Sequence, residues 1–309
     1  MLKDEIKCEN QIGSVDLVPS PRVLRMLGNI EFENWQCLAE LIDNSIDSLM
    51  GSSEGGTIGI VTPSTNEFDS DPDVFVKVWD DGPGMSKEQL QNCLKAGYSS
   101  NDPLSRLGLF GMGFNIATAR LGKTTQVMTT RKGDNYWTSV VIDFKEMEKS
   151  GNYVRPLYSI EKSNSDIHGT QVIIKNLGDR VRTIRKQSLN KKNLSRIYSP
   201  VLQKGKIKII INDDKLESRG HCIWGKDRSV ERGGEKIPAY IEINKNFGKE
   251  YYCINCWQWI DEVPVYEGIK AIKCPECGDD SGVIEKERNL SGWLGVQRHY
   301  DPENYGIDL

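Results

Sequence analysis

The order of apolar and polar positions along the chain predicts an α+β fold. Apolar residues recur with helical spacing from Arg22 to Met50, broken near Gly28, and the run 51–56 (GSSEGG) ends this pattern. Ser86 followed three positions later by Gln89 predicts a helix start, and another helix is expected over 114–121. Strand-like runs cover 57–62, 74–79, 125–130, 137–144 and 170–175. We expect a mixed, mainly antiparallel sheet with helices on one face.

Changes in composition along the chain predict two domains. Polar residues 1–20 are expected to form an arm, and residues 21–178 a first domain that includes a turn-rich connection over 63–73 and a loop over 97–113. A basic helical linker over 179–204 follows. The strand expected over 206–212 begins a second domain, 205–309, with a cysteine-bearing insert over 251–280 and a strand over 292–297. The chain ends without a cap or turn signal, so we expect this domain to be incomplete.

Overall composition narrows the class of protein. With 309 residues, 38% of them apolar, the chain is long enough to bury a core, which excludes wholesale disorder and collagen-like structure. It has neither an apolar run of membrane-spanning length nor a signal peptide, so we expect a cytoplasmic protein without a membrane partner. In that reducing compartment the 8 cysteines are interpreted as free thiols or metal ligands.

Four polar side chains form a stripe on the helix that ends at Met50. At 100° per residue, Glu40, Asn44 and Asp47 lie within a narrow arc with Asp43 beside them. The opposite side is apolar: Leu38, Leu41, Ile42, Ile46 and Leu49. An isolated stripe of this kind usually marks a solvated face, although exposed faces favour Lys, Glu and Arg over asparagine. The alternative is a site in which a carboxylate orients water and an amide oxygen holds Mg²⁺.

Glycines with polar neighbours occur in three further places. In 80–84 (DDGPG), Gly82 and Gly84 let a flat ligand approach closely, and Asp80 can accept a hydrogen bond from an exocyclic amine. The run 108–113 (GLFGMG) precedes a helix, and its backbone N–H groups can cradle phosphates. The third place is 168–170 (HGT), at the start of a strand. Each segment alone is equally typical of a turn.

The run 117–124 (ATARLGKT) nearly matches a Walker A loop. A true P-loop follows a strand and precedes a helix. Here the predicted order is reversed, so we interpret Gly122 as the end of a helix and reject the P-loop.

Four of the cysteines have the spacing of a zinc ribbon. Cys253 and Cys256 form one CxxC pair, and Cys274 and Cys277 form another 17 residues later. Two such pairs place four thiolates around a structural Zn²⁺ with no open position, which favours stability or partner binding over catalysis. The alternative is free cysteines in turns. Trp257 and Trp259 flank the first pair; they are interpreted as core residues, with a stacking surface as the alternative. The other cysteines (Cys8, Cys37, Cys93, Cys222) show no ligand spacing.

The net charge of −4 conceals two unlike halves. Residues 1–150 hold 14 basic and 22 acidic side chains, whereas 151–309 hold 26 and 22. Within the second half, residues 175–208 contain 11 Lys or Arg and a single acid, Asp179. This zone is either a solvated helix face or a surface for the phosphate backbone of DNA. Since it has no base-reading motif, DNA contact here would be independent of sequence.

Taken together and in this order, the motifs resemble those of the GHKL superfamily, named for gyrase, the heat-shock chaperone, histidine kinases and MutL. The run 39–47 (AELIDNSID) is similar to the N-box, 80–84 and 108–113 to the two glycine boxes, and Gly169-Thr170 to the final GT element. The segments AELIDNS, DDGPGM and 194–200 (LSRIYSP) resemble the MORC-like (microrchidia) branch. The resemblance implies a Bergerat-type α/β sandwich followed by a partial, transducer-like α/β domain that carries the zinc ribbon.

The resemblance also implies a role for each matching residue. Glu40 would act as general base and Asn44 would coordinate Mg²⁺, while Asp47 would be a structural or pocket-lining acid. Asp80 would bind the adenine amino group of ATP, supported through water by Thr170. The other implied nucleotide contacts are Gly82, Gly84, Met85, Gly108, Leu109, Phe110, Gly111, Met112, Gly113 and Phe114, with 97–107 as the moving lid.

The chain departs from the superfamily pattern at the γ-phosphate. Family ATPases use a Lys or Arg from the transducer domain, and MORC-like members often carry a Lys where this chain has Asn115. Arg298 or Lys123 would serve, or the residue lies beyond Leu309. The histidine-kinase branch is disfavoured, because it lacks the hydrolytic Glu and because His168, His221 and His299 occupy turn or strand contexts.

Three functions follow from these interpretations. The first is an Mg-ATP-dependent ATPase whose lid closure drives homodimerisation, in the manner of a MORC-like DNA clamp in genome maintenance or defence. DNA binding would place it at the nucleoid or in a nucleus. The second is a chaperone-like ATPase acting on protein clients. The third is a nucleotide-sensing module that does not hydrolyse ATP. The basic zone favours the first over the second, and Glu40 favours hydrolysis over sensing.

Overall fold

The computed structural model describes residues 20–51, 54–95, 112–186, 188–260, 265–266, 269–270, 273–278 and 280–299. The chain divides into two compact units. Among described residues, the first unit contains those before Tyr98, those from Phe110 to Lys191, and Lys206–Lys215. The second contains Lys192–Gly205 and the residues from Leu216 onward.

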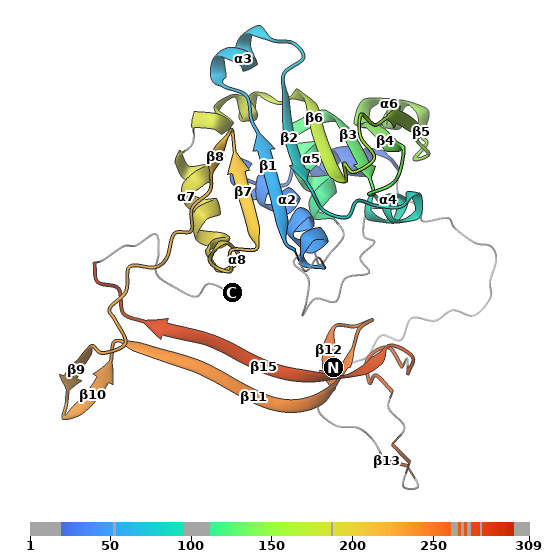
Figure 1. Cartoon of the computed structure of the whole chain (residues 1–309). Helices are drawn as coiled ribbons and strands as arrows, with labels where there is room; N and C mark the ends of the chain where they lie inside the picture. The colour runs from blue at the N-terminus through green and yellow to red at the C-terminus, as the bar shows by residue number, and fades with distance from the viewer. Residues whose placement is uncertain are drawn as a thin grey trace, which may run out of the picture. The chain divides into compact units, whose positions relative to one another are not determined.

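The first unit is built on an eight-stranded sheet in the order β5-β4-β3-β6-β2-β1-β7-β8 (Figure 1). Neighbouring strands are antiparallel except β1 and β7, which are parallel. The strands are β1 Gly56–Val61, β2 Phe75–Asp80, β3 Gly122–Thr130, β4 Tyr136–Asp143, β5 Leu157–Glu161, β6 Gly169–Leu177, β7 Ile207–Ile211 and β8 Asp214–Lys215. The α+β class, with a sheet of the Bergerat type, is confirmed.

Helices α2 and α5 pack on one face of this sheet and lie behind the strands in Figure 1. The helical segments are α1 Arg22–Leu27, α2 Asn34–Met50, α3 Thr65–Ser70, α4 Lys87–Cys93, α5 Gly113–Leu121, α6 Phe144–Ser150, the 3₁₀ helix η1 Asp179–Lys186, α7 Ser188–Ile197 and α8 Ser199–Gln203. The predicted apolar side of α2 is fully buried, with Leu38, Leu41, Ile42, Ile46 and Leu49 at most 2% exposed. None of the described helices is both long and apolar enough to cross a membrane.

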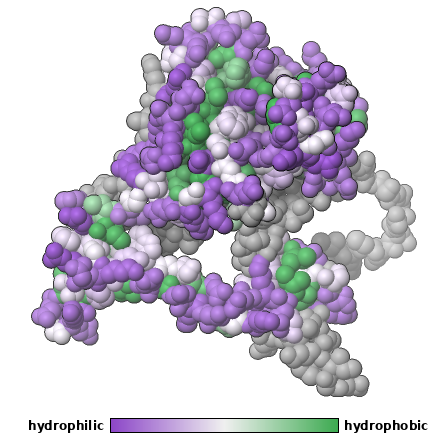
Figure 2. Space-filling model, in the orientation of Figure 1, coloured by the Kyte–Doolittle hydropathy of each residue, from purple (hydrophilic) through white to green (hydrophobic). Residues whose placement is uncertain are grey.

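The other face of the sheet carries half-exposed apolar side chains. In β2, Val76 and Val78 are buried whereas Phe75 is 38% exposed, as expected for a strand with one face in the core. Val61 of β1 is 40% exposed. Figure 2 shows apolar residues along the front of this unit, over the strands that Figure 1 draws nearest the viewer.

Several predicted boundaries are confirmed. The helical pattern of residues 22–50 divides into α1 and α2 on either side of Gly28. At α4, Ser86 Oγ accepts from the Gln89 N–H at 3.2 Å, and Gln89 Oε1 accepts from the Ser86 N–H at 2.8 Å, which completes the predicted capping box. Helix α5 ends at Leu121 and β3 follows directly from Gly122, so the rejected P-loop has the wrong element order.

Three elements differ from the prediction. Helix α3 lies within the segment 63–73 that we expected to be a turn-rich connection, because Ser64 and Glu67 form a capping box. Helix α6 and strand β5 were not predicted; every residue of β5 is exposed, so it lacks an alternating pattern. Such edge strands give little periodic signal.

The strand expected to begin the second domain belongs to the first unit instead. Strand β7 pairs in parallel with β1, with Gly56 opposite Ile207 and Ile60 opposite Ile211. Its inward residues Ile207, Ile209 and Ile211 are buried in the core. The alternating pattern identified a strand correctly, but a pattern does not specify which strand it joins.

From Leu216 onward, the described part of the second unit is β structure. Strands β9 Ser229–Arg232 and β10 Glu235–Pro238 form a hairpin. Strands β11 Tyr240–Cys253, β12 Gln258–Ile260 and β15 Val283–Gly295 form an antiparallel sheet in the order β12-β11-β15. The short strands β13 Val265–Tyr266 and β14 Ile269–Lys270 pair with each other inside the predicted cysteine-bearing insert.

Candidate active site and metal centre

The polar stripe of α2 is not a uniformly solvated face. Asn44 is exposed and Glu40 is half-buried, but Asp47 is only 6% exposed. Acidic side chains are rarely so buried unless they have partners. The solvated-face alternative therefore fails at Asp47, and the stripe has the graded burial of a cleft wall.

The carboxylate of Glu40 rests against the first residue of α5. A methyl group on Gly113 would overlap Glu40 Oε2, so only glycine allows this approach. Burial raises the pKa of Glu40 above its ordinary value. The backbone N–H groups of the first turn of α5 are without intrahelical partners, and such groups favour anions. A basic carboxylate thus lies beside a cradle suited to phosphate.

Asp80 lies at the end of β2, on the face that carries α2. Its Oδ2 accepts from Ser45 Oγ at 3.3 Å, and its Oδ1 accepts from the Gly82 N–H at 2.9 Å. Burial raises the pKa of Asp80 to about 6, partly offset by these two hydrogen bonds. A Cβ at Gly82 would lie 2.7 Å from both Asp80 Oδ1 and Ser48 Oγ, so the glycine keeps the space beside the carboxylate open.

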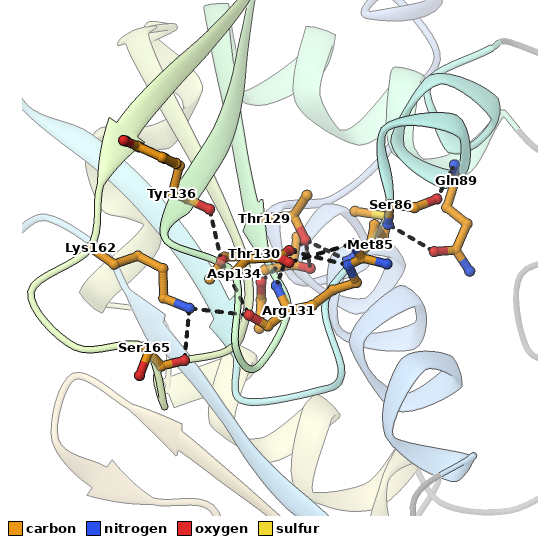
Figure 3. Close-up of polar contacts among 12 residues, drawn as sticks. Met85, Ser86, Gln89, Thr129, Thr130, Arg131, Asp134, Tyr136, Lys162 and Ser165 are labelled. Carbon is orange, nitrogen blue, oxygen red and sulfur yellow. Dashed lines mark hydrogen bonds and ion pairs between the residues drawn. The ribbon is translucent and has the colours of Figure 1, made fainter.

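The other wall of this space is formed by β3 and β6. Asp80 is directly opposite Thr170 in the ladder between β2 and β6, so the predicted pair is brought together. Thr129 Oγ1 lies 3.1 Å from Thr170 Oγ1 and accepts from the Met85 N–H at 2.9 Å (Figure 3). Gly84 has φ +71°, and any Cβ there would overlap the Thr130 carbonyl oxygen. The hydrogen bond from Met85 to Thr129 and the close contact of Gly84 with Thr130 therefore hold the turn 82–85 against β3.

Two residues of this arrangement were not predicted. Ser45 follows Asn44 on α2 and reaches Asp80, and Thr129 connects Met85 with Thr170. Ser45 lies within the polar N-box run, so its position in the sequence could have identified it as a site residue. No sequence signal identified Thr129, because a buried threonine in a strand is common and its partners are 41 and 44 residues away.

The two ends of the site are separated along α2. Ser45 at the Asp80 end lies five residues after Glu40, which corresponds to about 7.5 Å along a helix axis. A nucleotide also has a base end and a phosphate end. The site therefore has a buried carboxylate at one end and a general-base candidate beside a helix N-terminus at the other.

The remaining predicted contacts divide between described and undescribed residues. Gly108, Leu109, Phe110, Gly111 and the lid 97–107 lie outside the described residues. Met112 precedes α5, and Phe114 packs against the buried clusters around Leu90 and Leu24. Phe114 is partly buried by this packing.

The position of Lys123 does not support it as the γ-phosphate residue. Lys123 follows the C-terminal end of α5, about 13 Å along the helix from Gly113 and Glu40. Asn115 is buried, and its amide nitrogen has no hydrogen-bond partner among the described residues. Arg298 lies in the second unit, with its guanidinium 5.3 Å from the Trp224 ring centroid.

The four predicted zinc ligands converge in the second unit. Their ligand atoms all lie within 4.8 Å of one another, with Cys253 Sγ 3.7 Å from Cys277 Sγ and Cys256 Sγ 3.6 Å from Cys274 Sγ. Tetrahedral ligands at a Zn–S distance of about 2.3 Å are about 3.8 Å apart. The thiols therefore fit a tetrahedral metal.

The two CxxC turns have the same backbone geometry. The Trp257 N–H donates to the Cys253 carbonyl at 2.8 Å, and the Gly278 N–H donates to the Cys274 carbonyl at 2.9 Å. The donors have φ of +60° and +70°. Trp257 is 36% exposed, so its interpretation as a core residue is wrong; Trp259 instead packs against Tyr252. The left-handed turn directs Trp257 away from the core.

Ion pairs with acidic residues from elsewhere in the chain reduce the positive charge of the basic zone 175–208. Four of its side chains form ion pairs with acids from elsewhere in the chain: Lys175 with Asp73, Arg182 with Asp69, Arg185 with Glu67 and Lys191 with Asp214. Three of these acids belong to α3 and the turn after it. Lys204, Lys206 and Lys208 are exposed and have no ion pair among the described residues. With Arg180, which is also exposed, these three lysines remain available to a polyanion.

Comparison with known proteins finds a matching family and several similar relatives. Residues 31–171 match the family described as "Histidine kinase-, DNA gyrase B-, and HSP90-like ATPase". Over 130 residues the chain is 32% identical to Protein MICRORCHIDIA 3 of Arabidopsis thaliana, covering 41% of this chain and 21% of the relative. It is 36% identical to Protein MICRORCHIDIA 5 of the same plant over 99 residues, or 32% and 13% of the two chains. The chain thus spans about a fifth of these relatives or less.

Proposed function

Residues 31–171 form an ATPase domain of the GHKL type, related to the microrchidia proteins, and on that basis we propose that the chain is an Mg-ATP-dependent ATPase that dimerises when it binds nucleotide. The observation that carries the proposal is the contact of Glu40 with Gly113. It places a carboxylate of raised pKa beside the helix N-terminus that would receive the phosphates. Glu40 would take a proton from the attacking water.

The other residues of the site have complementary roles in this proposal. Asp80 would accept a hydrogen bond from the adenine amino group, with Thr170 beside it on β6. Asn44 is exposed on the same stripe as Glu40, and its amide oxygen is a suitable ligand for Mg²⁺, which would neutralise phosphate charge. Asp47 would line the pocket below Asn44. Gly113 makes room for the Glu40 carboxylate at one end, and Gly82 for the Asp80 carboxylate at the other.

A DNA clamp is the more specific form of the proposal. It relies on the exposed Lys204, Lys206 and Lys208, since four other basic residues of the zone are already paired. Such contacts would be independent of base sequence and sensitive to salt. A clamp would place the protein at chromosomal DNA. Action on a protein client is the alternative, and the partial neutralisation of the zone is the observation that favours it.

One experiment tests the proposed function and its clamp form. We expect ATP turnover by the whole chain, and sedimentation as a dimer with a non-hydrolysable ATP analogue but as a monomer without it. Duplex DNA should co-sediment with the analogue-bound form, and charge reversal at Lys204, Lys206 and Lys208 should weaken this association. Absence of both turnover and nucleotide binding contradicts the ATPase. Turnover without DNA association contradicts only the clamp.

We also propose that Cys253, Cys256, Cys274 and Cys277 hold one structural Zn²⁺. The metal would join the end of β11 to the start of β15 across the intervening insert. Purified protein should contain about one zinc per chain, measured by atomic emission, and Cys274→Ser should lower this several-fold. The apparent stability of the second unit should fall with it. Cys222→Ser, at an exposed cysteine outside the cluster, is the matched control and should retain the metal. Wild-type protein without bound metal contradicts the site.

A further inference from the structure

His168 contacts the glycine turn that follows Asp80. Its Nδ1 lies 2.7 Å from the Gly82 carbonyl oxygen. Because a carbonyl only accepts hydrogen bonds, Nδ1 carries the proton and donates. The backbone N–H of Gly82 donates to Asp80 Oδ1 at 2.9 Å. Gly82 is therefore held from both sides, by the proposed adenine acceptor and by the histidine.

The register of the sheet explains this contact. The last pair in the ladder between β2 and β6 is Asp80 opposite Thr170. Gly82 lies two residues beyond Asp80, and His168 two before Thr170, so they would be the next opposing residues in this register. The two backbones diverge there, and Gly169 has φ +128° with no room for a Cβ beside the Asp80 carbonyl. The imidazole takes the place of a backbone N–H and extends the ladder across the turn.

We propose that His168 is a positioning residue of the nucleotide site. By holding Gly82, His168 keeps the turn 82–85 in the conformation that receives a flat base beside Asp80. The far end of the turn is fastened independently, by the Met85 N–H to Thr129 Oγ1 bond at 2.9 Å. Loss of His168 therefore removes one of the two hydrogen bonds that hold Gly82 and leaves its N–H bond to Asp80. This inference rests on the proposed ATP site, and it concerns affinity for the base rather than the hydrolytic step at Glu40.

Substitutions at His168 separate this role from a general structural one. We expect His168→Ala to raise KM for ATP about three- to tenfold, the effect of losing one hydrogen bond, with kcat changed less than about twofold. In His168→Asn, Nδ2 is bonded to Cγ as Nδ1 is, so KM should return to near the wild-type value. In His168→Gln the amide lies one bond further out, and KM should resemble that of the Ala variant. His221→Ala in the second unit is the control.

A second measurement needs no nucleotide. Amide hydrogen exchange over residues 80–86 should be faster in the Ala and Gln variants than in wild type and the Asn variant. Unchanged KM and exchange in His168→Ala, with an active wild type, overturn the positioning role alone. A fall in kcat as large as the rise in KM also overturns it. If wild-type protein neither binds nor hydrolyses ATP, the proposed function fails and the positioning role fails with it.

Discussion

Replacement of Glu40 by Gln should abolish ATP turnover while leaving nucleotide affinity close to that of wild type. The substitution keeps the size of the side chain, so the contact with Gly113 and the N-terminus of α5 survives. What it removes is the ability to take a proton from water. General-base catalysis contributes about 10²- to 10⁴-fold to a rate, so kcat should fall by about that factor. Single-turnover kinetics and equilibrium binding of ATP measure the two effects separately.

The raised pKa of Glu40 adds a dependence on pH. Burial disfavours the charged form, so the side chain takes up a proton at a higher pH than the ordinary value of 4.5. Since the base must be ionised, kcat should fall as the pH decreases through this raised value. Glu88→Gln, at an exposed carboxylate on α4, is a matched control and should behave as wild type. Equal turnover by wild type and Glu40→Gln contradicts the assignment of the base.

Replacement of Asp80 by Asn should weaken ATP binding and stabilise the folded protein at the same time. In the proposed function the buried carboxylate accepts from the adenine amine, and hydrogen bonds to charged groups contribute about 1.5–3 kcal/mol, so affinity should fall by about 10- to 100-fold. Asparagine can still accept from the Gly82 N–H, as Asp80 Oδ1 does at 2.9 Å. The fold therefore keeps its local support while the nucleotide loses a charged partner.

The stability effect follows from the pKa of Asp80. Burial raises it from 3.8 to about 6, so the folded protein binds more protons than the unfolded chain between these values. Stability is therefore lost as the pH rises through this window, by up to about 3 kcal/mol at pH 7. Asp80→Asn removes this cost, because it has no charge to bury.

Urea unfolding at pH 7 and at pH 5 measures this effect. We expect the variant to be more stable than wild type by about 1–3 kcal/mol at pH 7, and by less at pH 5. Asp166→Asn, at an exposed carboxylate, controls for the loss of one negative charge. A variant that is less stable at both pH values contradicts the desolvation of Asp80. Unchanged ATP affinity contradicts its role in recognising adenine.

Local patterns in the sequence predicted much of this protein's fold and of its candidate sites. Helical spacing on α2 separated the apolar side that is buried from the stripe that carries Glu40 and Asp47, because each side chain's direction follows from its position on the helix. The glycines of 80–84 and Gly113 were recognisable because close approach requires them. The CxxC spacing identified the ligand cluster, since four thiolates around one metal need few residues from each segment.

Only the tertiary structure decided which distant residues meet. The register of β2 against β6 brings Thr170 opposite Asp80 and His168 to Gly82, and β3 adds Thr129. Ion pairs with α3 reduce the charge of the basic zone, and β7 joins the first sheet rather than opening a second domain. The physical reason is the same in each case. Side-chain direction is a local property of the backbone, whereas pairing across a sheet depends on long-range packing that no local pattern encodes.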